Sequence, residues 1–361
     1  EISTDSITLE QESEGFWLEE RLAYADTNLG YGAKNIAYVE SSNKLYVPSG
    51  MNTLFYEYDI DSGTWTQLAD APDRIYYGGG TVLGPDGYIY ALMGGNSTSF
   101  WRYNIDSNTW DTDISSAPLT VGYGGSALFD WHQYIYVLRG NNDEAFWRYD
   151  TFSDVWETLS QVDFGAPNTV VNNNVYIGGS LTIDLEEEKI YAIQGNYYVG
   201  FSVYDINTNT WDELDFIPAL PYYGASIESD GDSGIFFTSG NNNPYMFYYN
   251  IESEEWTQVS SAPMGFYYGG GVHRVGNSLY AIRGGNSRYF YRYSIEDDSW
   301  FLPKRGLFSR EFEGSVLLTG NYGEDILKGD GSYFYIMRGN FSDDFLQIGR
   351  AHVWTPVTEY D

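Results

Sequence analysis

The residues best suited to chemistry in this sequence are tyrosines, arginines and asparagines that recur at matching points along the chain. Each tyrosine precedes a glycine, and each asparagine follows a glycine at the end of an apolar run. The set comprises Tyr77, Tyr123, Tyr223, Tyr268, Arg139, Arg283, Arg338, Asn96, Asn141, Asn196, Asn241, Asn286 and Asn340. Aromatic rings beside guanidinium and amide groups suit a sugar, which stacks its C–H face and hydrogen-bonds through its hydroxyls, and they equally suit a protein partner.

We therefore predict that these side chains share one face and bind a ligand there, above all Tyr77, Tyr123, Tyr223, Tyr268, Arg139, Arg283, Arg338, Asn141, Asn196 and Asn286. The alternative is structural: the tyrosines pack between neighbouring repeats of the fold, and the asparagines cap turns through their own side chains. Asn96 and Asn340 also begin Asn-x-Ser/Thr sequons, which makes them glycosylation candidates on the same face.

Other chemistry is restricted by what the sequence lacks. Cysteine is absent, which excludes thiolate nucleophiles, disulfides and cysteine-bound zinc. The three histidines, His132, His273 and His352, are too scattered to predict a shared metal site. No nucleophile elbow, phosphate-binding loop, dinucleotide fingerprint or zinc-protease motif occurs. The stretches 59–63 and 230–234 resemble fragments of calcium loops but fit ordinary turns better, so we expect no cofactor, with calcium as the alternative.

The charge balance excludes several partners. With 51 acidic and 18 basic residues the formal charge is −33, which repels nucleic-acid backbones. The longest apolar runs fall well short of the roughly 20 residues that a membrane helix needs, so we expect a soluble chain. The chain opens at Glu1 without a hydrophobic leader, and we expect it to be a processed or trimmed product.

The elements that position these residues can be read from internal repeats. Six tryptophans recur at intervals of about 45 to 55 residues, each with a tyrosine seven positions earlier. The pairs are Tyr58 and Trp65, Tyr103 and Trp110, Tyr149 and Trp156, Tyr204 and Trp211, Tyr249 and Trp256, and Tyr293 and Trp300. An apolar run ending in glycine precedes each pair, and a seventh such run spans 334–340.

Each repeat indicates four short strands separated by turns, and no segment has convincing helical periodicity. Counting the apolar runs predicts seven repeats, and four-stranded repeats of this length are typical of a β-propeller. The sequence therefore predicts an all-β, seven-bladed propeller of four-stranded blades. Glycines suit the innermost strands, where backbones approach closely.

Glycines after the second strand, followed by Tyr-Asp and a tryptophan at fixed spacing, resemble kelch repeats over residues 16–355. The chain departs from the usual kelch pattern in carrying Tyr-Gly-Gly where Arg and His often open the inner strand. The kelch-type copper oxidases need a cysteine-linked tyrosine, so the absence of cysteine excludes that activity. Kelch-like rings often close by mixing both chain ends in one blade, which removes the open edge.

That resemblance implies that residues 16–22, with Trp17, supply the outer strand of a last blade made of residues 314–350. Trp354 competes for the same place. The remaining segments are a polar N-terminal tail, residues 1–15, which we expect to dock on a partner, and a C-terminal tail, residues 356–361.

Two functions fit these observations. We favour a non-catalytic extracellular or cell-surface protein that binds a surface protein or glycan, or that self-assembles as a structural subunit of a surface layer or filament. The alternative is a carbohydrate-active enzyme that resembles the kelch-type sugar mutarotases and works in the central channel. It would require Glu, Arg and His or Tyr together at the axis with perturbed pKa values.

Overall fold

The computed structural model describes residues 24–29, 36–50, 52–85, 87–165 and 173–301, together with the strands 325–328, 333–337 and 345–350. The chain divides into two compact units, residues 1–306 and 307–361. Within the described residues the only helical element is a 3-10 turn, η2 (Glu40–Ser42), and the regular structure is otherwise β-strand. The expected all-β class is confirmed.

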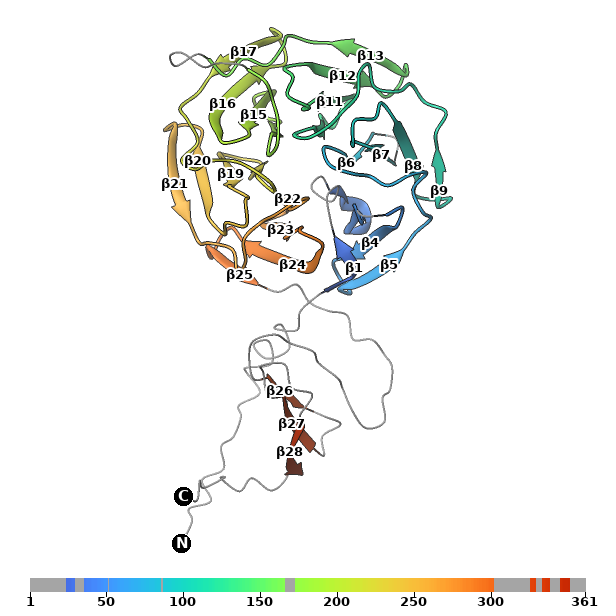
Figure 1. The fold of residues 1–361 in the computed structure, drawn as a ribbon, viewed down its shortest axis with the longest axis vertical. Helices are drawn as coiled ribbons and strands as arrows, with labels where there is room; N and C mark the ends of the chain where they lie inside the picture. The colour runs from blue at the N-terminus through green and yellow to red at the C-terminus, as the bar shows by residue number, and fades with distance from the viewer. Residues whose placement is uncertain are drawn as a thin grey trace. The chain divides into compact units, whose positions relative to one another are not determined.

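The first unit is a β-propeller of six blades arranged around a central axis (Figure 1). In each blade four antiparallel strands pair in chain order, from the innermost strand at the axis to the outermost at the rim. Blade 1 consists of β2 (Ala37–Val39), β3 (Lys44–Pro48), β4 (Phe55–Asp59) and β5 (Thr64–Gln67). Blade 2 consists of β6 (Gly80–Leu83), β7 (Tyr88–Leu92), β8 (Phe100–Asn104) and β9 (Thr109–Asp111). Blade 3 consists of β10 (Ser126–Phe129), β11 (Tyr134–Leu138), β12 (Phe146–Asp150) and β13 (Val155–Thr158).

The second half of the ring repeats the pattern. Blade 4 consists of β14 (Ser180–Asp184), β15 (Lys189–Gly195), β16 (Tyr198–Asp205) and β17 (Thr210–Glu213). Blade 5 consists of β18 (Ser226–Ser229), β19 (Gly234–Thr238), β20 (Met246–Asn250) and β21 (Glu255–Val259). Blade 6 consists of β22 (Gly271–Val275), β23 (Ser278–Ile282), β24 (Ser287–Ser294) and β25 (Ser299–Phe301).

The predicted number of seven blades is wrong, because the ring closes after six. At most blade boundaries a phenylalanine of the third strand packs against the repeat tyrosine and tryptophan of the next blade. The ring of Phe100, for example, lies 4.9 Å from that of Tyr149 and 5.1 Å from that of Trp156, measured between ring centroids. Phe290 of blade 6 makes the same contact with blade 1, at 4.9 Å from Tyr58 and 5.4 Å from Trp65. Blade 6 therefore packs directly against blade 1 and leaves no place for a seventh blade between them.

The residues predicted to supply the closing strand, 16–22, lie outside the described residues. The first described strand, β1 (Tyr24–Leu29), pairs with β24, where Tyr24 faces Tyr289 and Leu29 faces Ser287. This N-terminal strand thus joins the blade of residues 271–301. Leu29 is fully buried in a core that includes Leu45 of blade 1 and Ile282 of blade 6, so β1 helps to seal the ring.

The seventh apolar run belongs to the second unit. There β26 (Asp325–Lys328), β27 (Tyr333–Met337) and β28 (Phe345–Arg350) form a three-stranded antiparallel sheet. Trp354 and the tails 1–15 and 356–361 lie outside the described residues. The count of apolar runs therefore exceeded the number of blades, whereas the count of Tyr–Trp pairs matched it.

In four of the six blades, the repeated tyrosine and tryptophan bind the connection from the preceding blade. The Tyr149 hydroxyl donates to Asp154 Oδ1 at 2.8 Å, and the same oxygen accepts the Ser115 N–H of the preceding connection at 2.7 Å. The Trp156 indole N–H donates to the Ser115 carbonyl at 2.9 Å. Equivalent contacts recur with Trp110, Trp211 and Trp300. The tyrosine and the tryptophan stand seven residues apart because both side chains bind the same backbone segment of the preceding connection.

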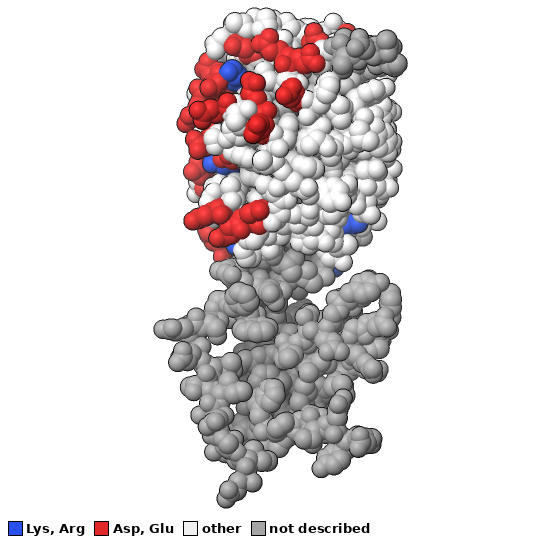
Figure 2. Space-filling view, turned by 90° about the vertical axis from the view of Figure 1, so that its left-hand side faces the viewer, with Lys and Arg blue, Asp and Glu red and all other residues white. Residues whose placement is uncertain are grey.

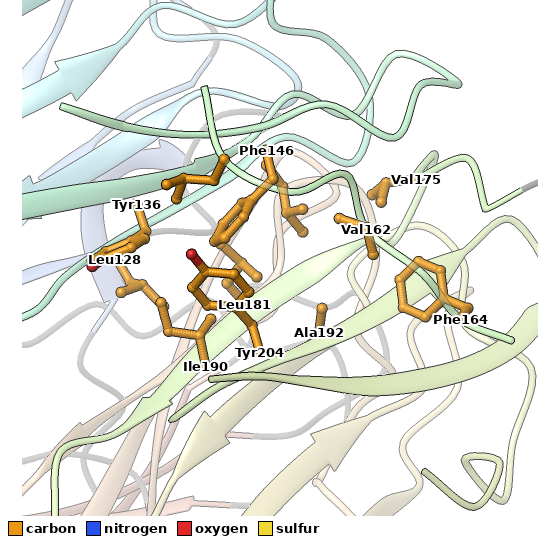
Figure 3. Close-up of a cluster of buried hydrophobic side chains, with 12 residues drawn as sticks. Leu128, Tyr136, Phe146, Val162, Phe164, Val175, Leu181, Ile190, Ala192 and Tyr204 are labelled. Atoms are coloured by element: carbon orange, nitrogen blue, oxygen red, sulfur yellow. The ribbon is translucent and has the colours of Figure 1, made fainter. Parts of the chain in front are cut away.

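The core lies between adjacent blades, in layers that repeat around the ring. Between blades 3 and 4, Leu128, Tyr136 and Phe146 pack against Leu181, Ile190 and Tyr204 (Figure 3). Because each sheet buries both of its faces in this way, the second strands read as continuous apolar runs and not as alternating ones.

Candidate functional site

The four tyrosines predicted to share a face converge at one end of the central channel. Tyr77 and Tyr123 stack with ring centroids 3.8 Å apart and planes 5° apart, and Tyr223 lies 3.7 Å from Tyr268. Tyr123 and Tyr223 meet edge to face at 6.4 Å, so the two pairs are joined. Burial is the main reason why the pKa of Tyr123 rises to about 12, and it also raises the pKa of Tyr223. Both hydroxyls are therefore neutral near pH 7.

Glycines after these tyrosines bring the blades close enough for the rings to meet. Gly124 has φ +83°, a left-handed conformation, and a Cβ placed there would lie 2.0 Å from the carbonyl oxygen of Tyr176. Gly78 is more crowded still, with the Gly122 carbonyl oxygen 1.6 Å from the same position. The Tyr-Gly-Gly sequence is therefore required by backbone contact at the axis, and it leaves only about 50 Å³ of open space at this end.

The predicted arginines and asparagines that the structure describes surround this tyrosine end, but they stabilise loops there: the arginines donate hydrogen bonds to loop atoms, and the asparagines adopt left-handed turns. Arg139 Nε donates to the Thr120 carbonyl at 3.0 Å, and Arg283 Nη2 donates to Asn242 Oδ1 at 3.0 Å. The asparagines hold left-handed turns, with φ of 63° at Asn96, 60° at Asn141, 56° at Asn196, 56° at Asn241 and 57° at Asn286. Asn96 is exposed, as a glycosylation site requires. Arg338 and Asn340 lie outside the described residues. A ligand at this face stays a prediction.

A larger space lies at the other end of the channel. A cavity of about 220 Å³ is lined by the six innermost strands and by residues of the turns that follow them. Most of its wall is apolar or hydroxyl-bearing, as with Leu83, Ile183 and Ser226. Three charged or titratable side chains break this pattern: Glu228 on β18, and His273 and Arg274 on the neighbouring β22.

Glu228 and His273 form a pair across the boundary between blades 5 and 6. Glu228 Oε1 lies 3.3 Å from His273 Nδ1 and accepts the Arg274 backbone N–H at 2.9 Å. Thr182 Oγ1 accepts the Ser229 N–H at 2.8 Å in the same way between blades 4 and 5. The hydrogen bond from the Arg274 N–H to Glu228 therefore also helps to join neighbouring blades. The carboxyl side chain is 18% exposed and the imidazole 25%, and both line the cavity.

The low polarity of the site shifts both groups toward their neutral forms. Burial raises the pKa of Glu228 from 4.5 to about 7, against a smaller opposing effect of the Arg274 N–H and charge. Burial lowers the pKa of His273 from 6.5 to about 4, and the Arg274 charge acts in the same direction. Near neutral pH the pair therefore offers a carboxyl that retains much of its proton beside an unprotonated imidazole. A proton donor and a proton acceptor at one wall of a cavity can act together on one bound molecule.

Sequence analysis missed Glu228 and Arg274 and gave His273 no role beyond excluding a shared metal site, whereas His273 lies within the inner strand β22 and lines the cavity. The signal was present in the repeats. Five residues after the aromatic or isoleucine that opens each glycine run stand Val82, Leu128, Thr182, Glu228 and His273. At this position the five repeats can be compared directly, and the acidic Glu228 and the imidazole of His273 differ from the apolar or hydroxyl-bearing side chains of the other three.

The two flat faces of the propeller differ in charge. Seen edge-on, the acidic side chains gather toward one face (Figure 2). The turns from first to second strand and from third to fourth strand lie at one end of every blade, and they are rich in carboxylates. Examples are Glu40, Asp59, Asp61, Asp106, Asp130, Asp150, Asp154, Glu186, Glu187, Glu188, Asp205, Asp230, Asp232, Glu252, Glu254, Glu296, Asp297 and Asp298. The larger cavity lies at this acidic end, because turn residues such as Trp131, Leu185 and Gly231 line it.

The remaining sequence hypotheses concern turns. Asp59 Oδ1 accepts the Ser62 N–H at 2.8 Å, and Asp230 Oδ1 accepts three N–H groups of its own turn, so both carboxylates cap turns. Across the described parts of the chain, no three His, Asp or Glu side chains come together as a metal-ligand set. No helix among the described residues has the length and apolarity to cross a membrane. His352 lies outside the described residues.

Arg102 and Arg148 act structurally, as their recurrence in the third strand predicts. Arg148 Nε donates to Glu157 Oε2 at 2.8 Å, and its guanidinium lies 4.3 Å from the Tyr134 ring centroid. Arg102 repeats both contacts with Asp111 and Tyr88.

Comparison with known proteins identifies the fold. No protein-family model and no curated protein matches the chain. Among solved structures, the one titled "Structure of YjhT" aligns with a TM-score of 0.59 over 77% of this chain and 99% of YjhT, at 14% identity. A likeness at this low identity shows the β-propeller fold, in agreement with the six blades described above.

Proposed function

We propose that this propeller is a carbohydrate-active protein that binds a small neutral sugar in its central channel and transfers protons to and from it through Glu228 and His273. The pairing of these two side chains at the wall of the 220 Å³ cavity carries the proposal. That volume is below the roughly 300–1,000 Å³ of pockets for drug-sized ligands, so it suits a single sugar ring. The surrounding carboxylates disfavour an anionic sugar.

The chemistry that fits the pair is exchange between the two anomers of a reducing sugar. Glu228 donates its proton to the ring oxygen while His273 accepts the proton of the anomeric hydroxyl. The bond between the anomeric carbon and the ring oxygen breaks, its electron pair stays on the ring oxygen, and the O–H pair becomes the carbonyl bond. Reversal on the other carbonyl face closes the other anomer. The two reacting oxygens share one carbon, which suits a donor and an acceptor only 3.3 Å apart.

Anomer exchange measured by NMR on neutral monosaccharides tests the proposal. The wild-type protein is expected to accelerate exchange, and Glu228→Gln and His273→Gln to lose at least 90% of that acceleration, since general acid–base catalysis typically contributes about 10²- to 10⁴-fold. Glu252→Gln, which removes an exposed carboxylate far from the channel wall, serves as the control and keeps the wild-type rate. Equal rates in all four proteins would refute the catalytic role.

The pH profile gives a second, independent test. Catalysis needs a protonated Glu228 and a neutral His273, so the rate should fall above pH 7 and again below pH 4. A rate that keeps rising through pH 8 would mean that Glu228 is not the acid.

A second candidate is the non-catalytic extracellular role, in which a kelch-like propeller acts as a binding module or as a structural subunit of a surface layer or filament. Exposed apolar side chains on the loops of the tyrosine end favour it, among them Leu119, Tyr197, Leu220 and Tyr245 at 51%, 46%, 57% and 46% exposure. Electron microscopy and light scattering before and after deletion of residues 1–15 test assembly. Polymers that vanish with the deletion would support a structural subunit, and monomers in both samples would reject it.

A further inference from the structure

We propose that Trp131 is the platform on which the sugar ring stacks as it enters the channel, a role that rests on the proposed function for its ligand class. Trp131 is the second residue of the turn between β10 and β11, and it lines the large cavity. Its side chain is 48% exposed although it is the largest apolar side chain of the turn. An indole at a cavity mouth presents a flat apolar surface of the kind that the C–H face of a pyranose covers.

The backbone of Trp131 is held in a conformation that its side chain disfavours. Its φ is 61°, in the left-handed region, which costs an L-residue with a bulky side chain roughly 1–2 kcal/mol. Such strain is most often found where a side chain has a role in binding or catalysis.

Blade 5 contains the same turn with a glycine at the equivalent position. Asp130 Oδ1 accepts the N–H groups of His132, Gln133 and Tyr134 at 2.9, 2.8 and 2.9 Å. Asp230 Oδ1 accepts the equivalent three N–H groups at 2.9, 3.0 and 3.0 Å. The residue that follows Asp230 is Gly231, with φ 78°. The position is therefore glycine in blade 5 and tryptophan in blade 3, although the backbone is left-handed in both turns.

The hydrogen bonds of the turn hold the backbone that carries the indole. Asp130 is buried, with 7% exposure, so its three accepted hydrogen bonds anchor the turn firmly. The Trp131 ring lies 6.1 Å from the Phe129 ring, centroid to centroid, at an angle of 46°. The backbone of the turn is thus already ordered before a ligand binds, which limits the entropic loss on binding.

The position opposite the acid–base pair gives the platform its function. Trp131 belongs to blade 3, whereas Glu228 and His273 belong to blades 5 and 6, and all three line one cavity. A sugar ring between them has its apolar face on the indole and its hydroxyls toward the polar wall. Leu185, exposed by 45% in the neighbouring turn of blade 4, widens the apolar lip.

The experiment measures binding and anomer exchange separately, using saturation-transfer NMR titrations with glucose, galactose, mannose, xylose and N-acetylglucosamine. The proteins are wild type, Trp131→Asn, Trp131→Phe and Glu228→Gln. Asparagine accepts a left-handed conformation, so the turn is kept while the ring is lost. Phe152→Asn is the matched control, because Phe152 is a 69% exposed aromatic in a turn of the same blade and does not line the cavity.

At least tenfold weaker binding by Trp131→Asn, a smaller loss by Trp131→Phe and wild-type binding by Phe152→Asn are the expected result, and Glu228→Gln is expected to lose anomer exchange. Equal binding by Trp131→Asn and wild type would overturn the platform even if exchange is catalysed. Loss of binding in Trp131→Asn without any exchange by the wild type would keep the platform and refute the proposed function. No binding of any sugar by the wild type would overturn both.

Discussion

Replacing Glu228 by glutamine should change how the stability of the propeller depends on pH. Since burial raises the pKa of Glu228 from 4.5 to about 7, folding favours the protonated carboxyl. Its contribution is complete below pH 4.5 and is lost as the pH rises through 7. Each tenfold change in the dissociation constant corresponds to about 1.4 kcal/mol, so the loss amounts to at most about 3 kcal/mol.

Glutamine cannot ionise and still offers an oxygen to the Arg274 N–H. We therefore expect the unfolding free energy of wild type, measured relative to Glu228→Gln, to fall by up to about 3 kcal/mol between pH 4.5 and 8. The lowered pKa of His273 acts in the opposite sense, since its contribution is present above pH 6.5 and lost as the pH falls through 4. Comparison with the glutamine variant, in which His273 is retained, limits the effect of that second titration.

Urea unfolding followed by tryptophan fluorescence at pH 4.5, 5.5, 6.5, 7.5 and 8 measures the difference. Glu252→Gln removes the same charge from an exposed turn, so it controls for the general repulsion within a chain of net charge −33. Parallel pH curves for the two glutamine variants would refute the reasoning, because Glu228 would then titrate as a solvated carboxylate does.

Two further predictions concern the architecture. Phe146→Ala should lower the unfolding free energy in urea by about 3–5 kcal/mol, because the ring is fully buried between blades 3 and 4; Phe152→Ala, at 69% exposure, should change it by less than about 0.5 kcal/mol. Gly124→Ala should prevent stable folding in a thermal melt, because its Cβ would lie 2.0 Å from the Tyr176 carbonyl oxygen, whereas Gly87→Ala, with φ +76° and nothing within 4 Å, should cost only about 1–2 kcal/mol. Similar melting temperatures for the two alanine variants would contradict the close approach of blades at the axis.

The predicted tyrosine face shows which parts of the site local sequence can predict. Tyr77, Tyr123, Tyr223 and Tyr268 do converge, because residues at equivalent points of equivalent blades must meet at the axis. What the repeats did not reveal is that the rings pack against each other and leave little space. Side-chain packing across an axis depends on the number of blades, which local spacing does not encode.

The channel pair was hidden for a different reason. Glu228 is one of 51 acidic residues, and nothing near it in the sequence marks it as buried. Its raised pKa comes from the surrounding blades, and its neighbour His273 stands 45 positions later in the chain. The sequence also gave no sign of Trp131, because its left-handed φ is a property of the folded turn.

The sequence by itself determined the all-β class and the four-stranded repeat, since the tyrosine, the tryptophan and the apolar run recur at fixed spacing. Only the tertiary structure decided how many repeats enter the ring, because closure depends on whether Phe290 meets Tyr58 and Trp65 and not on how many repeats the chain contains. It also decided which carboxyl lies in the low-polarity channel, because burial is set by residues far apart in the chain.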